Sequence, residues 1–191
     1  MIQSSVEIKS WSERTPPVEQ VRPCTCIRCC AASRPPGRPL QIIGHGLRAR
    51  QVLGPSQLGQ QPVALALQVR RFLCLVCGAV MTVVPRGVVS TRLYCAVAIM
   101  LGLALWAIRK LSTAAVREQV SPWQAVAEPR QWAMPARWVR AVRQARLFAE
   151  QVRPAPARWS HRQVAERVVT SLWARAAPGA EGLEAMVVVP S

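Results

Sequence analysis

The chain of 191 residues contains no aspartate, and all nine of its acidic residues are glutamates. Metal-dependent phosphoryl transfer needs clustered carboxylates to hold its ions, so this scarcity argues against such an enzyme. A Ser-His-Asp triad is excluded because no Asp is present. The two histidines, His45 and His161, lie beside no nucleophile motif, and no Gly-rich phosphate loop occurs. We therefore expect a protein that is not an enzyme.

Lysine is also scarce, since only Lys9 and Lys110 occur, whereas 23 arginines raise the formal net charge to +16. A surplus of this size favours a polyanionic partner, either nucleic acid or an anionic membrane surface. We expect the partner to be DNA, and we expect no small-molecule substrate. Apolar residues make up 51% of the chain, which allows one or two small domains with buried cores.

The opening stretch MIQSSVEIKSWSERTPP is polar and lacks the apolar segment of a secretory signal, which predicts a cytoplasmic protein. Disulfides are disfavoured in a reducing cytosol, so the seven cysteines need another explanation. Two Cys-x-x-Cys pairs are present, Cys26 with Cys29 and Cys74 with Cys77. Two such pairs can present four thiolates tetrahedrally, which is the arrangement of a structural zinc site. The sequence therefore predicts Zn²⁺ held by these four cysteines.

Three strand-like segments accompany the pairs, at residues 40–53, 63–72 and 79–84. The stretch GPSQLGQQP separates the first two, as a turn region would. This is the layout of a zinc ribbon, which we expect over residues 23–87 after a flexible tail at residues 1–22.

The first cysteine pair has competitors for the metal. The run CTCIRCC also offers Cys24 and Cys30, and His45 is a further possible ligand. Cys26 and Cys29 are favoured because their spacing equals that of the second pair. The segment GHG around His45 is more simply interpreted as a turn or bulge.

From Ser90 onward the sequence predicts helices, so the expected fold class is α+β. Residues 93–108 form an apolar run without a charge, shorter than the roughly 20 residues of a membrane-spanning helix. We expect a buried helix there. A helix capped by Ser112 should follow, and then another helix that begins at Pro122 with Ser121 as its N-cap. This order suits a helix-turn-helix within residues 88–151, whose last helix can enter the major groove.

A basic amphipathic helix is predicted from Pro135, with Trp138 on its apolar face and an arginine at every third position. Such a helix could follow phosphates along a duplex. Ser160 and Gln163 form a capping box that opens a last helix, within a segment 152–191 that ends in a frayed tail. The residues that we expect to bind nucleic acid are Arg70, Arg71, Arg117, Gln124, Arg137, Arg140 and Arg143.

The stretch from Cys26 to about Trp138 resembles an uncharacterised bacterial family of transposase-like proteins with a zinc-ribbon head and a helix-turn-helix. The matching stretches are CIRC, GHGLRARQV, VRRFLCLVCGAVMTVVPRG, RLYCAVAIMLGLALW and VREQVSPW. The resemblance implies zinc and DNA binding. The chain departs from the family at Cys30, which replaces a small turn residue. It also has neither the length nor the Asp residues for the catalytic carboxylate domain of a transposase.

The expected function is therefore that of a zinc-dependent DNA-binding protein of mobile-element origin, without a catalytic domain. One alternative is a small membrane-associated protein anchored by residues 93–108. A second alternative is a zinc-stapled protein-interaction module whose basic charge is incidental.

Overall fold

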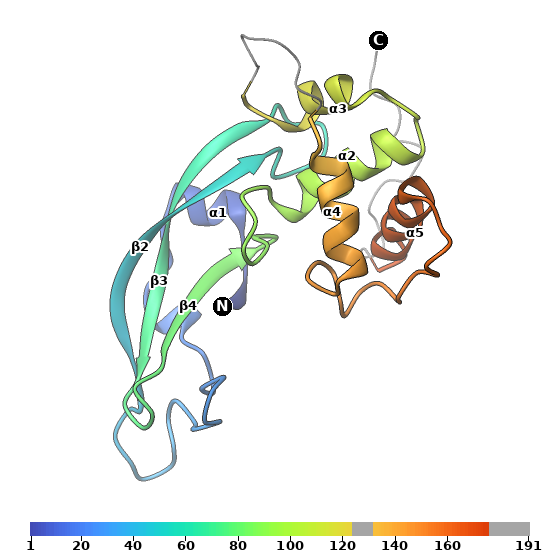
Figure 1. Cartoon of the computed structure of the whole chain (residues 1–191). Helices are drawn as coiled ribbons and strands as arrows, with labels where there is room; N and C mark the ends of the chain where they lie inside the picture. Colours follow the sequence, from blue (N-terminus) through green and yellow to red (C-terminus); the bar gives the residue numbers. More distant parts are fainter. Residues whose placement is uncertain (124–131, 176–191) are drawn as a thin grey trace. The chain divides into compact units, whose positions relative to one another are not determined.

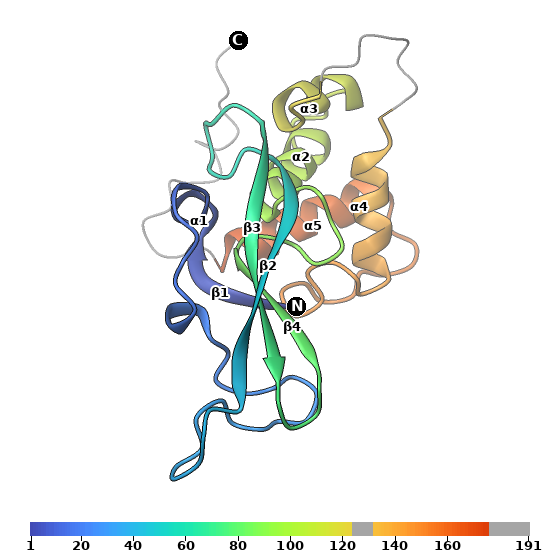
Figure 2. The ribbon, with the colours of Figure 1, turned by 90° about the vertical axis from the view of Figure 1, so that its left-hand side faces the viewer.

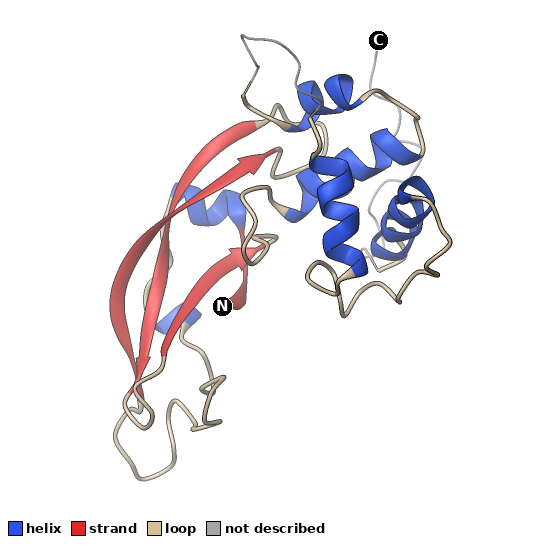
Figure 3. Ribbon diagram, viewed as in Figure 1, coloured by secondary structure: helices blue, strands red, loops and turns tan. Residues whose placement is uncertain are grey.

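The computed structural model describes residues 1–123 and 132–175. Within these ranges it contains one four-stranded sheet and five α-helices, so the fold is α+β as expected. The strands come from the N-terminal half of the chain, and most helices come from the rest, as the sequence colours of Figure 1 and the element colours of Figure 3 show together. The chain divides into a sheet unit, Met1–Val52 with Ala64–Leu93, and a helical unit, which begins at Tyr94 and also includes Leu53–Val63.

The sheet has the strand order β1-β4-β3-β2. β2 spans Ile42–Gly54, β3 spans Val63–Cys74 and β4 spans Val80–Arg86, which confirms the three strands predicted from the sequence. β2 and β3 lie side by side in both views of the ribbon (Figures 1 and 2). β3 and β4 are antiparallel, with Phe72 opposite Met81. Residues paired in this way project from the same face of a sheet, so both contribute to one core.

The N-terminal segment differs from the flexible tail expected over residues 1–22. β1 (Ile2–Glu7) pairs in parallel with β4, and the short helix α1 (Ile8–Glu13) follows it. The side chain of Trp11 in α1 is 1% exposed, and its Nε1 donates a hydrogen bond to the carbonyl of Gln68 at 2.9 Å. The prediction of a flexible tail is therefore wrong. Burial of the large Trp11 side chain stabilises the fold by roughly 2 kcal/mol, and it anchors a segment that is otherwise polar.

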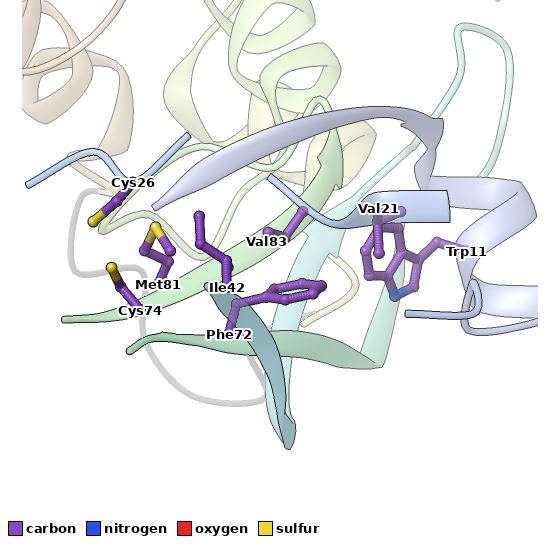
Figure 4. Packing of buried hydrophobic residues seen from close by; sticks show 8 residues of the cluster. All are labelled: Trp11, Val21, Cys26, Ile42, Phe72, Cys74, Met81 and Val83. Atoms are coloured by element: carbon purple, nitrogen blue, oxygen red, sulfur yellow. The ribbon is translucent and has the colours of Figure 1, made fainter. Parts of the chain in front are cut away.

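The core of the sheet unit lies between the sheet and this N-terminal segment, which includes the short 3-10 helix η1 (Glu19–Val21). Figure 4 shows its buried side chains: Trp11, Val21, Cys26, Ile42, Phe72, Cys74, Met81 and Val83. Two of the predicted zinc ligands are thus members of the hydrophobic core.

The helical unit is built around α2 (Ala96–Ala107), which packs against α3 (Thr113–Val120), α4 (Met134–Arg143) and α5 (His161–Trp173). Most residues of α2 are buried, as is usual for a helix that is apolar on every side. The predicted buried helix is therefore confirmed between Ala96 and Ala107, whereas Leu93 precedes it and is exposed.

Among the described residues, no helix combines the length and the apolar character needed to cross a membrane.

Two of the predicted caps are confirmed. The Ser112 hydroxyl accepts a hydrogen bond from an N–H of the first turn of α3, and Ser160 with Gln163 forms the capping box of α5. Ser121 instead ends α3, and its hydroxyl accepts a hydrogen bond from the Tyr94 hydroxyl at 3.0 Å. Pro122 and Trp123 are not helical, and residues 124–131 of the predicted recognition helix lie outside the described residues.

α4 ends at Arg143, although the apolar face of the basic helix predicted from Pro135 continues in the sequence to Phe148. The N–H of Arg146 bonds to the carbonyl of Ala141 at 2.9 Å, and the N–H of Ala145 bonds to that of Val142 at 3.0 Å. This pair of bonds is a Schellman motif, which stops a helix with one residue at positive φ. Here that residue is Ala145, at a φ of 51°, so no glycine marks the end in the sequence.

A cluster of aromatic rings fixes the contact between α2 and α4. Trp138 is 1% exposed, and the rings of Tyr94 and Trp132 meet it edge-on with centroids 5.4 and 5.6 Å away. Gly102 of α2 lies against the same ring, because a Cβ placed on it would stand 2.8 Å from Cζ3 of Trp138. The absence of a side chain at this position allows the two helices to approach.

We expect Gly102→Ala to destabilise the protein by up to about 2 kcal/mol. Overpacking against the fixed Trp138 ring costs roughly 1–3 kcal/mol, which outweighs the gain of about 1 kcal/mol when Gly becomes Ala inside a helix. Thermal unfolding followed by circular dichroism measures the difference. A melting temperature above that of the unaltered protein would contradict the packing described.

Candidate metal centre

The first cysteine pair lies in a tight turn. The N–H of Cys26 donates to the carbonyl of Ala31, and the N–H of Cys30 donates to the carbonyl of Cys26, both at 2.9 Å. Thr25 and Ala32 close the turn as an antiparallel bridge. These bonds hold the backbone so that both thiols of the pair can face the same point.

The second pair lies in a turn with the same hydrogen bonds. Cys74 is the last residue of β3, and its N–H donates to the carbonyl of Ala79 at 2.9 Å. The N–H of Gly78 donates to the carbonyl of Cys74, also at 2.9 Å. Cys30 and Gly78 are equivalent in the two turns, and both have positive φ angles, 58° and 70°. The two turns are therefore repeats of one local structure.

A single backbone position connects the two turns. The N–H of Gln41 donates to the carbonyl of Ser33 at 2.9 Å, just beyond the first turn, and its carbonyl accepts from the N–H of Leu75 at 2.8 Å, inside the second. The pairs consequently meet although they are far apart in the sequence. Sequence reasoning missed Gln41, and no signal could have found it, because it contributes only backbone atoms.

The four thiols predicted as ligands lie together. All their sulfur atoms are within 4.8 Å of one another, and the Sγ atoms of Cys26 and Cys77 and of Cys29 and Cys74 are 3.7 Å apart. A tetrahedral ion with metal–sulfur bonds of about 2.3 Å places its ligand sulfurs roughly 3.8 Å apart. These cysteines lie close enough to bind a metal ion.

The cluster is closed on one side and open on the other. Cys26 is 1% exposed and Cys74 is fully buried, and Figure 4 shows their sulfur atoms directed toward each other beside Met81. Cys77 is half-buried and Cys29 is exposed. A metal ion can therefore reach the sulfurs from the side of Cys29, while the hydrophobic core supports the other side.

Electrostatics in the cluster favour one thiolate and oppose a second. The backbone N–H groups of Cys29 and Arg28 lower the pKa of Cys26 to about 6. At Cys29, the N–H of Ala31 lowers the pKa of the thiol. Desolvation and the neighbouring thiols, Cys77 foremost, outweigh this effect and raise the pKa of Cys29 to about 12. Four thiolates at this distance need a cation to offset their repulsion. Metal binding must release protons, so it weakens as the pH falls.

The competing ligands are not part of this group. Cys24 and Cys30 are exposed, and neither joins the four sulfurs. His45 lies exposed in β2 and is likewise not a member. The choice of Cys26 and Cys29 from the spacing agrees with the group that the structure brings together.

The predicted nucleic-acid residues on β3 are half-buried. Arg70 and Arg71 are consecutive, so they point to opposite faces of the sheet. The Nε of Arg70 donates to the carbonyl of Pro16 at 2.8 Å, which ties β3 to the N-terminal segment. Arg70 thus stabilises the fold of the sheet unit.

Two predicted residues of the helical unit also contact backbone carbonyls. The Nε of Arg117 donates to the carbonyl of Trp123 at 3.1 Å. The guanidinium of Arg143 donates to the carbonyl of Trp159 and, at 3.4 Å, to that of Pro156. Both arginines hold loops in place.

The remaining predicted contacts are more accessible. Arg137 and Arg140 are exposed on α4, one helical turn apart. Gln124 lies outside the described residues. The six described positions are divided between the sheet unit and the helical unit, so the structure does not gather them on one element.

Comparisons with known proteins identify no relative. A scan against protein-family models finds no match, and searches of curated proteins and of solved structures find none either. The resemblance to transposase-like proteins has no support from these comparisons and stays a prediction. The function must be argued from the chemistry of the chain itself.

We expect replacement of both Cys74 and Cys77 by Ser to abolish metal binding, because two thiols alone cannot complete a tetrahedral site. The control variant replaces Cys24 and Cys30 by Ser, which makes the same chemical change outside the four-sulfur group. Metal bound after dialysis is measured by atomic emission. Equal metal content in the two variants would refute the assignment.

Cys30→Gly should stabilise the metal-loaded protein by about 1 kcal/mol, because a residue other than Gly is strained at positive φ. The opposite change in the equivalent turn, Gly78→Ala, should destabilise it by a similar amount, since a Cβ there meets nothing within 4 Å and only the backbone is strained. Chemical denaturation measures both differences. A less stable Cys30→Gly variant would show that the two turns are not equivalent.

Proposed function

We propose that this protein is a zinc-dependent DNA-binding protein of the cytoplasm, without a catalytic domain. The observation that carries the proposal is the convergence of four thiols in two repeated turns at one end of a sheet. A tetrahedral set of four sulfurs suits zinc or iron. Zinc is favoured because two Cys-x-x-Cys pairs that form a four-cysteine tetrahedral site are typical of structural zinc.

The arrangement of β3, β4 and the two turns supports the interpretation as a zinc ribbon. The proposed ligands are the thiolates of Cys26 and Cys29 in the first turn and of Cys74 and Cys77 in the second. Zinc bound there would supply folding free energy, about 10–16 kcal/mol in small zinc domains. The sheet unit could thereby hold a binding surface without a large core.

The charge balance supports a polyanionic partner. Ion pairs within the described part of the chain join Arg22 and Arg34 to Glu19, and Arg86 to Glu7 at 3.6 Å. Nine acidic residues cannot neutralise 25 basic ones. A chain with this surplus attracts nucleic acid by displacing condensed counterions.

α4 offers the clearest basic surface among the described elements. Arg137 and Arg140 are exposed, while Trp138, Val139 and Ala141 are buried on the inner side. This separation leaves the two arginines accessible to phosphates. Arg71 and Gln124 remain further contacts in the proposal. Mobile-element origin is not needed for it.

We expect duplex DNA to bind with an affinity that falls by roughly two to three decades between about 50 and 200 mM salt, as for four to six phosphate contacts. Replacing Arg137 and Arg140 by Gln should reduce the slope of log affinity against log salt by about 2. The control replaces Arg153 and Arg158, which are exposed in a loop of the same unit, with the same loss of charge. Fluorescence anisotropy of a labelled duplex measures the binding.

The alternatives are tested by the same titration. If DNA does not bind at low salt, or binds without salt dependence, the proposal fails and a protein-interaction module becomes the better interpretation. An equal effect of the two double variants would show that total charge, and not α4, determines binding. Binding of iron in place of zinc would be visible as thiolate-to-iron absorption, which zinc lacks.

A further inference from the structure

A pocket of about 390 Å³ opens on the sheet unit. All of its lining residues belong to that unit, and they come from β2, β3, β4, the first residue of the chain and the segment after β4. This volume lies within the range of small-ligand sites, roughly 300–1,000 Å³. The lining residues are Met1, Arg48, Ala49, Arg50, Gln51, Val69, Val80, Thr82, Thr91, Arg92 and Leu93.

The charge of the pocket is entirely positive. Arg48, Arg50 and Arg92 line it, and no carboxylate is among the lining residues. Like charges gathered in one hollow repel each other unless an anion lies between them. The pocket therefore has the charge of an anion site and contains no anionic side chain to neutralise it.

Hydrogen bonding fixes one of these arginines in place. Nη2 of Arg50 donates to the carbonyl of Val89 at 2.8 Å and to that of Arg92 at 3.1 Å. The Nε atoms of Arg50 and Arg92 are buried and have no hydrogen-bond partner within the described residues. Because these Nε atoms are closed off from solvent, an anion in the pocket would contact the terminal Nη atoms of the guanidinium groups instead.

The position of Arg50 costs free energy that an anion would offset. Burial lowers the pKa of its guanidinium, and the neighbouring charge of Arg48 lowers it further. Both effects disfavour the charged form. An anion held against the two guanidinium groups would act in the opposite direction.

The other lining residues suit a phosphate group. Thr82 and Thr91 bring hydroxyl groups, and Gln51 brings an amide, all of which can hydrogen-bond to phosphate oxygens. Val69 and Val80 form an apolar part of the pocket wall. Apolar surroundings lower the local dielectric constant, which strengthens the attraction between the arginines and an anion. Guanidinium groups bind phosphate oxygens in pairs, with better directionality than ammonium groups.

We propose that this pocket binds a phosphate group through Arg48, Arg50 and Arg92. The phosphate can belong to a nucleic-acid backbone or be free in solution, and the chemistry of recognition is the same. The pocket does not depend on the DNA-binding proposal, because its lining and its positive charge exist without it. If DNA binds, the pocket is one of the places where a backbone phosphate is held.

Inorganic phosphate, titrated into the full-length protein at low salt by calorimetry, tests the proposal. Arg48 is the residue to replace, because it is exposed and its loss disturbs none of the hydrogen bonds that fix Arg50. Arg48→Gln should weaken phosphate binding about tenfold, as expected for a lost charge-assisted hydrogen bond. The control is Arg38→Gln, an exposed arginine of the same unit outside the pocket, which should leave the affinity unchanged.

Thr82→Val serves as a second variant, since it removes one hydroxyl from the pocket without changing the charge. A weakening of about threefold to tenfold is expected, with unfolding curves showing that each variant remains folded. Absence of phosphate binding to the unaltered protein at millimolar concentration overturns the proposal. An equal loss in Arg48→Gln and Arg38→Gln overturns it too, because it would show a general effect of charge.

An additional binding experiment with duplex DNA distinguishes a backbone phosphate from free phosphate. If Arg48→Gln weakens DNA binding more than Arg38→Gln, and inorganic phosphate competes with the duplex, the pocket holds a backbone phosphate. If phosphate binds as expected but DNA binding is the same in both variants, the pocket takes free phosphate. If DNA binds but phosphate does not, the pocket proposal fails while the proposed function stands.

Discussion

The meeting of two cysteine turns at one end of the sheet is the constraint on which the sheet unit depends. Cys26 and Cys74 are ligands of the candidate metal centre and also members of the core that contains Phe72 and Met81. Metal binding and apolar packing are therefore linked, since an ion that fixes the four sulfurs also fixes the end of the core. Because the cluster favours one thiolate at Cys26 and opposes a second at Cys29, it is suited to a bound cation.

The sequence alone predicted those features that depend on local patterns. The strands β2, β3 and β4 follow from apolar segments and turn residues, α2 from its uncharged run, and the four cysteines from their spacing. β1 was missed because a parallel strand pairs with β4 through residues far apart in the chain, and its own sequence is polar. The early end of α4 was missed because Ala145 replaces the usual glycine.

The structure divides the arginines into two groups that composition cannot separate. Arg70 and Arg143 donate to backbone carbonyls and support the fold, whereas Arg137 and Arg140 are exposed. Net charge therefore overstates the number of residues available to a polyanion. An arginine that hydrogen bonds fix in the lining of a pocket, such as Arg50, identifies a binding position better than a count of charges does.

X-ray absorption at the zinc edge of the purified protein tests the central claim most directly, because it reports the ligand atoms around the ion. The account predicts a single shell of four sulfur atoms at about 2.3 Å. A shell with nitrogen or oxygen ligands, or a protein that takes up no zinc, would contradict it.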